Sequence, residues 1–250
     1  MNTKPLRILI HGASGRMGQA VLRLAADVPA HAPAPAPAPW QVVAAVTRRA
    51  PTQRVVDGVP HFAAAELAAA PEFDVAIDFS LPEGFDPVLA LCAERGRALV
   101  SGTTGLDADQ RGALEAAARV IPLLWASNFS VGVAVLNELV ERAACALPGW
   151  DCDIVESHHV HKKDAPSGTA LTLGESAQQG GAQPRYASLR AGDIVGEHLV
   201  QFAGQGERVE LVHRATNRDI FARGALQAAS RLHGRGPGLY TMRGLLFGAG

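Results

Sequence analysis

The sequence predicts an α/β protein with a doubly wound parallel sheet in its first half and a smaller α+β domain in its second half. Short apolar runs alternate with helical patterns up to about residue 128, and after that point the order changes to a helix, strands and a hairpin. The apolar runs are rich in Val, Ile and Leu without clean alternation, which is typical of strands covered on both faces. A β-α-β-α order of this length implies parallel strands joined by right-handed crossovers.

The elements of the first half follow one another with short connections. The predicted strands cover residues 6–11, 41–46, 74–79, 97–100 and 121–125. The predicted helices cover residues 15–26, 63–69, 82–95 and 107–119. An alternating Ala-Pro tract at 31–39 interrupts the order, and we expect it to be an extended surface loop without a function, because proline supplies no backbone donor.

The second half opens with a helical stripe of apolar residues at 131–147. A strand, a helix and the two strands of an antiparallel hairpin are predicted at 151–157, 169–178, 197–202 and 208–213. The tail from Arg223 returns to helix, is broken at 236–238, and is expected to pack on the first domain. We therefore expect one domain formed by 1–128 with 219–250 and a second formed by 129–218.

Composition excludes several classes of partner. The chain has 250 residues with 24 acidic and 23 basic side chains, and its formal charge of -1 is too weak to argue for nucleic acid or an anionic membrane. The cysteines at 92, 145 and 152 form no C-x-x-C pair, and no apolar run reaches the ~18 residues of a membrane span. We expect a cytoplasmic protein that acts on a small molecule, without a metal ion, through a local site.

A glycine-rich turn follows the first predicted strand. The segment Gly12–Gly18 has the pattern G-x-x-G-x-x-G and opens a helix, so the turn brings free N–H groups and the positive end of a helix dipole toward a pyrophosphate. The carboxyl ends of parallel strands meet at one edge of a sheet, so the loops at 47–49, 80–82, 102–105 and 127–129 are expected to converge there. A purely structural turn is the alternative.

The end of the second predicted strand bears on cofactor choice. Thr47 stands where an acidic residue usually accepts the adenosine ribose hydroxyls, and Arg48 and Arg49 follow it. Guanidinium groups suit a 2′-phosphate because they form bidentate, charge-assisted hydrogen bonds. We infer that NADPH is at least accepted, the alternative being two solvated arginines.

Cationic side chains are concentrated in one segment. Only three of the 23 basic residues are lysines, at 4, 162 and 163, and three of the nine histidines stand at 158, 159 and 161. These groups precede a predicted helix start at Ser167-Gly168-Thr169, a combination that can receive an anion, and a histidine there can donate a proton. A small substrate with two negative charges, which accepts a hydride and a proton, would fit this segment. The alternatives are a zinc site on the histidines, a solvated basic loop and a nucleic-acid patch.

With these motifs the sequence resembles the dihydrodipicolinate reductase family. The resemblance rests on segments that run in family order across nearly the whole chain, at 12–18, 77–80, 102–105, 128–132, 158–170, 190–198 and 221–225. The pattern H-H-x-x-K-x-D-A-P-S-G-T-A at 158–170 is the most specific of them. The resemblance implies an N-terminal Rossmann domain, a substrate-binding domain with an open mixed sheet through which a homotetramer forms, and domain closure about the crossings at 128 and 218.

The resemblance also implies roles for individual residues. His158 would be the catalytic proton donor and Lys162 the second catalytic residue, and substrate would be held by His159, Lys162, Ser167, Gly168 and Thr169. The implied cofactor-binding residues are Gly12, Ala13, Ser14, Gly15, Arg16, Met17, Thr47, Arg48, Gly102, Thr103, Thr104, Ala126, Ser127, Asn128 and Phe129. With NADPH and/or NADH, the implied reaction is reduction of 4-hydroxy-tetrahydrodipicolinate (dihydrodipicolinate) at C4 to tetrahydrodipicolinate, in diaminopimelate and lysine biosynthesis.

Two positions depart from the family pattern. Thr47 replaces an acidic residue of many members, and the segment 180–190 lacks a Gly-rich, Arg-containing stretch that longer members carry. Two rival functions are another two-domain NAD(P) oxidoreductase of amino-acid metabolism, such as an aspartate or homoserine dehydrogenase, and a nucleotide-binding sensor without activity. The first does not explain the histidine-lysine pattern, and intact His158 and Lys162 argue against the second.

Overall fold

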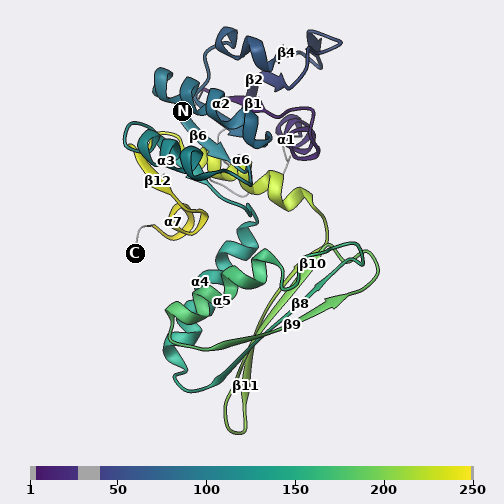
Figure 1. Cartoon of the computed structure of the whole chain (residues 1–250), viewed down its shortest axis with the longest axis vertical. Coiled ribbons are helices and arrows are strands. Elements are labelled where there is room, and N and C mark those ends of the chain that lie inside the picture. Colours follow the sequence, from purple (N-terminus) through teal and green to yellow (C-terminus); the bar gives the residue numbers. More distant parts are fainter. Residues whose placement is uncertain (1–3, 28–39, 249–250) are drawn as a thin grey trace. The chain divides into compact units, whose positions relative to one another are not determined.

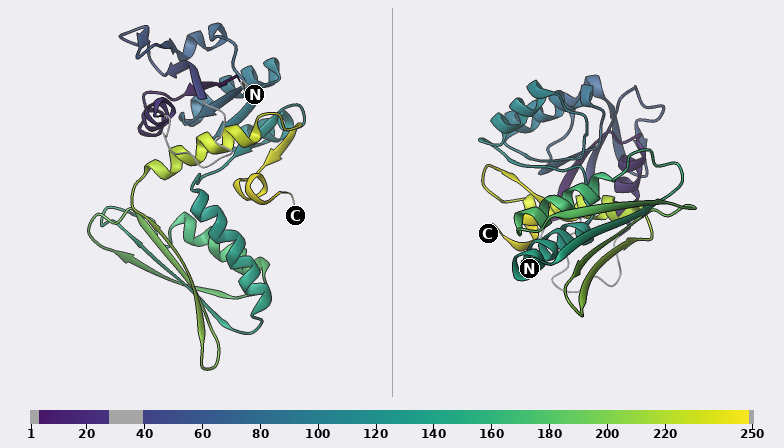
Figure 2. Two further views of the ribbon diagram at one scale, coloured as in Figure 1. Left: turned by 180° about the vertical axis from the view of Figure 1, so that it is seen from behind. Right: turned by 60° about the horizontal axis from the view of Figure 1, so that its bottom comes forward.

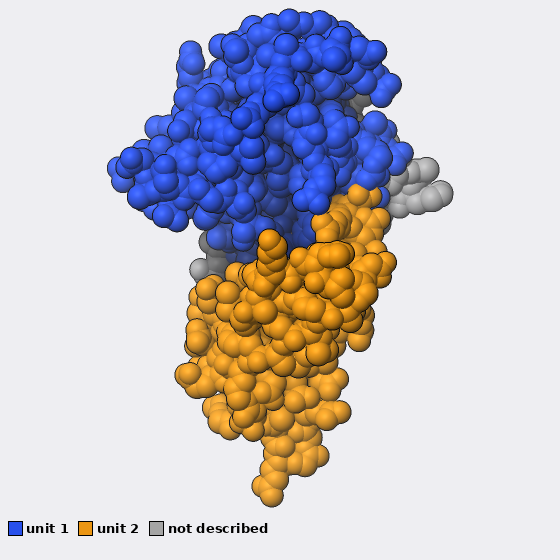
Figure 3. Space-filling view, turned by 45° about the vertical axis from the view of Figure 1, so that its right-hand side comes forward, with its two compact units in different colours: residues 1–129, 221–250 blue, residues 130–220 orange. Residues whose placement is uncertain are grey.

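The computed structural model describes residues 4–27 and 40–248, so the Ala-Pro tract lies outside the described residues. The chain divides into two compact units (Figure 3). Unit 1 consists of residues 1–129 and 221–250, and unit 2 consists of residues 130–220. The described part of the C-terminal tail therefore packs within unit 1.

Unit 1 is built on an eight-stranded sheet with the order β12-β7-β6-β5-β1-β2-β4-β3 (Figure 1). The central strands are β1 (Leu6–His11), β2 (Trp40–Thr47), β5 (Val75–Asp78), β6 (Ala98–Ser101) and β7 (Pro122–Trp125). They pair in parallel with their neighbours, which confirms the predicted doubly wound sheet. The strand order reverses direction between β1 and β5, and in sheets of this kind ligands bind at the carboxyl edge where the order reverses.

The helices of unit 1 pack on this sheet because each has one apolar face. They are α1 (Arg16–Ala26), α2 (Pro82–Arg95), α3 (Ala108–Ala117) and α6 (Asp219–Leu232). Residues of α2 and α3 join the strands in one core cluster that includes Phe85, Cys92 and Leu114. Right-handed crossovers place α1 on the opposite face of the sheet from α2 and α3. Asp107 caps α3 by accepting a hydrogen bond from the Gln110 N–H at 2.8 Å.

Several short elements of unit 1 differ from the sequence-based prediction. Residues 63–69 were predicted as a helix and form the 3-10 helix η1 (Ala64–Ala69). Strands β3 (Val55–Val56) and β4 (Val59–Ala63) were not predicted, and neither was β12 (Gly238–Tyr240), which pairs with β7 before the short helix α7 (Met242–Phe247). Strands of two to five residues at a sheet edge carry too little periodic pattern to be recognised before their partners are known.

Unit 2 is a four-stranded mixed sheet with two helices on one face. Its elements are α4 (Val131–Ala146), β8 (Asp151–His158), α5 (Gly168–Gln179), β9 (Pro184–Arg190), β10 (Gly196–Ala203) and β11 (Arg208–Ala215). The order is β11-β10-β8-β9, with β10 antiparallel to both neighbours and β8 parallel to β9, as in the open mixed sheet that the resemblance implied. Figure 2 shows α4 and α5 side by side along one face of this sheet.

The core of unit 2 lies between that face and the two helices. Side chains alternate along β8 and β10 between buried and half-buried positions, so Cys152, Ile154, Val200 and Phe202 pack against α4 and α5. Strand β9 was missed by the sequence analysis because most of its residues are exposed and it carries no apolar run. Across the described residues, no helix is long and apolar enough to cross a membrane.

Candidate active site

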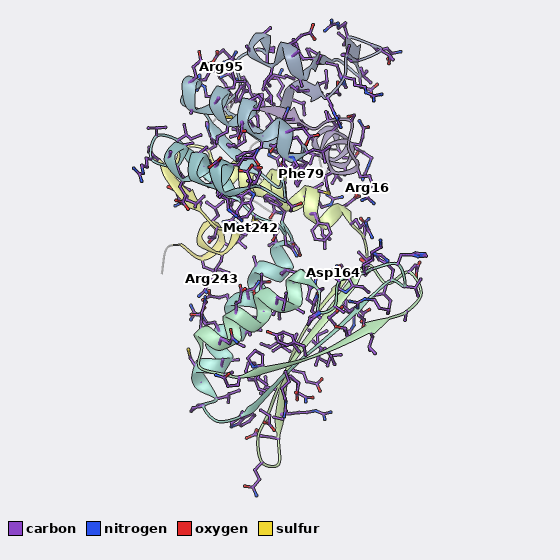
Figure 4. All side chains as sticks on the ribbon, viewed as in Figure 1. Arg16, Phe79, Arg95, Asp164, Met242 and Arg243 are labelled. Atoms are coloured by element: carbon purple, nitrogen blue, oxygen red, sulfur yellow. The ribbon has the colours of Figure 1, made fainter. Side chains whose placement is uncertain are left out.

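The glycine-rich turn of unit 1 forms a close-packed cradle at the start of α1. Gly12 adopts φ +77°, and a Cβ on it would lie 2.5 Å from the Phe79 carbonyl oxygen. Gly18 is buried in α1, where a Cβ would overlap the Gly12 carbonyl oxygen. Ser14, Gly15 and Arg16 remain exposed, and Arg16 opens the helix (Figure 4). This cradle fits the pyrophosphate of a dinucleotide, since only glycine permits such a turn beneath a helix N-terminus.

Below the turn, one buried carboxylate connects the ends of three strands. Asp78, at the end of β5, is fully buried and accepts hydrogen bonds from His11 Nδ1 at 2.9 Å, Ser101 Oγ at 2.8 Å, Thr103 Oγ1 at 2.7 Å and the Ser80 N–H at 3.0 Å. Burial alone would raise the pKa of Asp78, but the hydrogen bond and charge of His11, with the bonds from Ser80 and Thr103, outweigh it and lower the pKa. The sequence analysis gave Asp78 no role.

Replacing Asp78 by alanine is expected to destabilise the protein by about 1–3 kcal/mol, because buried donors lose their acceptor. It should also weaken dinucleotide binding, since Asp78 holds the loops that follow β1, β5 and β6. Urea unfolding and a fluorescence titration with a reduced dinucleotide measure the two effects. The matched control is Asp74→Ala at the other end of β5, where Asp74 binds Arg7 Nη2 at 2.7 Å. That variant should lose stability and keep nucleotide affinity; equal losses of affinity in both would contradict the role of Asp78.

The remaining loops at this edge pack on aromatic side chains. Phe79 and Phe129 meet edge to face with ring centroids 5.4 Å apart, and a Cβ on Gly102 would overlap the Phe79 ring. Thr104 is exposed, but Thr103 is 1% exposed and its hydroxyl binds Asp78, so that hydroxyl is not free to reach a ribose or nicotinamide. Ser127 is exposed, whereas Ala126 and Asn128 are half-buried beside Phe129.

A cavity of about 580 Å³ opens beyond the end of β2. It is lined by Ser14, Gln19, 47–53, Val56 and His61. The Thr47 hydroxyl donates to the Arg49 carbonyl oxygen at 2.7 Å and is therefore committed to the loop. The Arg48 guanidinium is exposed and lies 3.6 Å from a Glu83 carboxylate oxygen, a weak pair that leaves it available to a phosphate.

In unit 2, His158 ends β8 beside a buried carboxylate. Its Nδ1 lies 2.5 Å from Glu156 Oε2, and Glu156 is 1% exposed. Arg190 of β9 donates to both oxygens of Glu156, at 2.7 and 2.9 Å. Burial alone would raise the pKa of Glu156, but hydrogen bonds from Arg190, Ser188 and His158 lower it to about 2. His158 is thus held by an ionised acceptor at neutral pH.

The loop between β8 and α5 carries the other basic groups. Lys162 Nζ binds Asp164 Oδ1 at 2.9 Å, and this hydrogen bond lowers the pKa of Asp164. His159 Nε2 lies 3.3 Å from Arg218 Nη2, and burial, followed by the charge of Arg218, lowers the pKa of His159. Lys163 and Asp164 are both exposed, and Figure 4 labels Asp164 between β8 and α5. The Asp164 carboxylate therefore orients the Lys162 ammonium.

The start of α5 meets this loop. Ser167 caps the helix by accepting from the Ala170 N–H at 3.2 Å, and its Oγ lies 3.2 Å from His198 Nε2. Gly168 is exposed and Thr169 is half-buried, so the first turn of α5 faces solvent beside His158. Burial, and then the charges of His158 and His213, lower the pKa of His198 to about 4, so this imidazole is neutral at pH 7. The structure brings together every predicted substrate-binding residue at one end of unit 2.

Four residues around this end were not assigned a role by the sequence analysis. They are Glu156, Arg190, His198 and Arg218. Glu156 and His158 stand two residues apart at the end of a strand, and this spacing indicates that their side chains share one face of the sheet. Arg190 and His198 lie in a motif that carried the family resemblance. Within 4–27 and 40–248, no group of three or more His, Cys, Asp or Glu side chains could hold a metal ion.

A Rossmann-type unit with a dinucleotide cradle, and a second unit with a basic anion site and a histidine, define the class of two-domain nicotinamide-dependent oxidoreductases. The family models for the N-terminus and the C-terminus of dihydrodipicolinate reductase match residues 6–129 and 132–246. The chain belongs to the dihydrodipicolinate reductase family. It is therefore an enzyme, a reductase that uses a nicotinamide cofactor.

Similar proteins agree with this assignment. A 4-hydroxy-tetrahydrodipicolinate reductase of Stenotrophomonas maltophilia (strain R551-3) is 76% identical over 98% of this chain and 100% of its own. A protein of the same name from Xanthomonas campestris pv. campestris (strain B100) is 70% identical over the same shares. The solved structure of dipicolinate-bound dihydrodipicolinate reductase from Paenisporosarcina sp. TG-14 has a TM-score of 0.79 at 22% identity, covering 95% of this chain and 98% of that one. At 22% identity, this structural similarity is evidence for the fold alone.

Proposed function

We propose that this chain catalyses, in the cytoplasm, the NAD(P)H-dependent reduction of 4-hydroxy-tetrahydrodipicolinate to tetrahydrodipicolinate in diaminopimelate and lysine biosynthesis. In the balanced reaction, substrate, NAD(P)H and one proton give product, NAD(P)⁺ and water. The observation that carries the proposal is the grouping of His158, Lys162 and the first turn of α5 around one anion site. Membership in the family and relatives that bear this enzyme's name support it.

In unit 2, one group of residues would bind the substrate and His158 would transfer the proton. Lys162 and the N–H groups and hydroxyls of Ser167, Gly168 and Thr169 would hold the two carboxylates of the substrate, with His159 beside them. His158, or a water that it positions, would donate the proton. When bound, the nicotinamide supplies hydride to C4 of the substrate. Residues 12–17 would hold the pyrophosphate, and the loops at 102–104 and 126–129 would contact the nucleotide.

A direct assay tests this function. Aspartate semialdehyde and pyruvate are condensed enzymatically, and the purified chain is added with NADPH or with NADH. Oxidation of the cofactor, followed at its absorbance maximum, should depend on the condensed substrate. An absence of oxidation with both cofactors would overturn the assignment. Omission of pyruvate serves as the control, because aspartate semialdehyde alone is not the proposed substrate.

For the cofactor, we propose that NADPH is accepted through Arg48. Replacing Arg48 by alanine should raise the KM for NADPH by about 10- to 100-fold, since a hydrogen bond to a charged group contributes about 1.5–3 kcal/mol. The KM for NADH should change far less, because NADH has no 2′-phosphate. Steady-state kinetics with both cofactors provide the comparison within one variant. Equal changes for NADPH and NADH would refute the phosphate role.

We also propose that the chain forms a homotetramer through the open face of the unit 2 sheet. Paired residues across the four strands place Val212, Leu199, Val155 and Ala187 in one row on the face opposite α4 and α5. Val212 is 40% exposed, and Leu189 on the same face is 55% exposed. Such an apolar row is typical of an interface between copies of a chain. Sedimentation equilibrium measures the mass, and a monomer at micromolar concentration would contradict this assembly.

A further inference from the structure

Glu156 is the most completely bonded side chain near the proposed proton donor. Its Oε1 accepts from Arg190 Nη2 at 2.7 Å and from the Ser167 N–H at 3.2 Å, and its Oε2 accepts from Arg190 Nη1 at 2.9 Å and faces His158 Nδ1. A buried carboxylate with these donors stays ionised and cannot turn away. Its contact with Nδ1 orients the His158 ring and leaves Nε2 as the atom that can exchange a proton with a substrate.

Arg190 connects this carboxylate to the loop that carries Lys162. Besides the two bonds to Glu156, its Nη2 donates to the Asp164 carbonyl oxygen at 2.6 Å, and its Nε donates to the Lys162 carbonyl oxygen at 3.3 Å. One guanidinium therefore fixes the partner of His158 and the main chain on both sides of Lys163. Lysine could not do this, because it offers a single point charge in place of a planar fork of donors.

The opposite edge of the His158 ring is bounded by a glycine. A Cβ on Gly196 would lie 3.0 Å from His158 Nε2, so a side chain at 196 would crowd the atom that faces away from Glu156. Residues 158 and 196 lie at neighbouring ends of β8 and β10, in line with the pairing of Ser157 with Glu197. The ring is therefore held on its Nδ1 side and left uncrowded on its Nε2 side.

We propose that Glu156 and Arg190 act as a positioning pair for the reaction, with Glu156 fixing His158 and Arg190 fixing both Glu156 and the Lys162 loop. This inference rests on the proposed function of His158 and Lys162. It deepens that function by naming the groups that set the geometry and charge of the proton donor. Neither residue needs to contact the substrate.

Other charged and titratable groups also surround His158. They are Arg190 on β9, His198 on β10 and His159 in the following loop. The ring centroids of His158 and His198 lie 5.3 Å apart. His198 is neutral at pH 7 because its pKa is about 4, and the remaining groups are cationic or, for His159, favoured in the neutral form. Glu156 is thus the anion that lies between the Arg190 guanidinium and the His158 ring.

The test is the substitution Glu156→Gln, which keeps the shape and removes the charge. We expect kcat to fall by about 10- to 100-fold, as for general acid–base catalysis that is weakened without being abolished, with little change in the KM for substrate. The pH dependence of kcat should also change, because the charge beside the proposed proton donor is removed. Glu156→Asp should recover part of the rate. Activity and NADPH binding of the wild-type chain are measured first, so an inactive wild type would count against the proposed function alone.

A matched control is Glu138→Gln in α4. Glu138 is also a buried glutamate of unit 2, 5% exposed, and it accepts a hydrogen bond from Arg142 Nε at 2.6 Å. This variant should keep the wild-type pH profile even if its melting temperature falls. A wild-type pH profile and an unchanged kcat in Glu156→Gln would overturn the positioning role.

A measurement on the intact protein covers the case in which Glu156→Gln does not fold. Nitrogen-15 NMR of histidine-labelled protein, with His158→Gln for assignment, should show a proton on His158 Nδ1 with a strongly downfield resonance. That signal is expected from a short hydrogen bond to a carboxylate. A neutral His158 with its proton on Nε2 would contradict the proposal.

Discussion

Replacing Lys162 by alanine is expected to lower kcat/KM by about 10²- to 10³-fold, the loss typical of one electrostatic group aimed at developing or bound charge. Lys162 Nζ lies 2.9 Å from Asp164 Oδ1, and Arg190 Nε donates to the Lys162 carbonyl oxygen at 3.3 Å. The ammonium therefore has a fixed place in the loop that precedes α5, and the first turn of α5 would receive a substrate carboxylate. NADPH affinity should stay nearly unchanged, because the dinucleotide cradle belongs to unit 1. Steady-state kinetics and a fluorescence titration measure the two quantities.

The neighbouring lysine offers a matched control. Lys163 is exposed and has no assigned contact with the substrate, so Lys163→Ala should retain turnover within about twofold, as expected of an exposed charge. Lys162→Arg keeps the charge but replaces a compact ammonium with a planar fork, and we expect only partial activity. A similar loss in the two alanine variants would show that the net charge of the loop matters and that Lys162 has no specific role.

Replacing Gly18 by alanine is expected to abolish tight NADPH binding and to destabilise the protein by about 1–3 kcal/mol, the usual effect of overpacking a close contact. A Cβ at this position would overlap the Gly12 carbonyl oxygen, so α1 would have to move away from the turn. The N–H groups at the start of α1 would then no longer meet the pyrophosphate. Thermal unfolding and an NADPH titration report the two losses.

Gly112 provides the comparison for this substitution. It lies within α3, and a Cβ on it would meet nothing within 4 Å. Gly112→Ala should therefore leave NADPH binding unchanged and stabilise the protein by about 0.5–1 kcal/mol, because alanine loses less backbone entropy in a helix. Unimpaired NADPH binding by Gly18→Ala would show that the close approach of α1 to the turn is not needed.

Much of the fold could be predicted from the sequence because long elements carry their own periodic pattern. The central strands of unit 1 and helices α1, α2, α4 and α5 lie within a few residues of the predicted ranges. Strands β9 and β12 were missed because their pairing partners, not their own residues, make them strands. Gly224 belongs to the motif at 221–225, but the sequence does not reveal why a glycine is needed there. In the structure a Cβ at 224 would overlap the Phe129 carbonyl oxygen.

The candidate site shows the same division. His158, Lys162 and the Ser167-Gly168-Thr169 turn lie within twelve residues of one another, so their types and order indicate an anion site without knowledge of the fold. The resemblance implied that Thr103 binds the cofactor, and the structure shows that its buried hydroxyl donates to Asp78, which joins three strand ends. Only pairing in the parallel sheet reveals that function, because residues 78 and 103 lie 25 positions apart.

The sequence alone determined the class of fold, the glycine cradle, the basic segment and the family, since each depends on residue types at short spacing. Only the tertiary structure shows which side chains form hydrogen bonds with the residues of the basic segment and its flanks. Arg190 reaches Glu156 from a strand 34 residues later in the chain, and His198 reaches Ser167 from 31 residues later. The physical reason is that the charge and hydrogen bonding of a buried group depend on whichever side chains the sheet registers beside it, and register is a property of the folded chain.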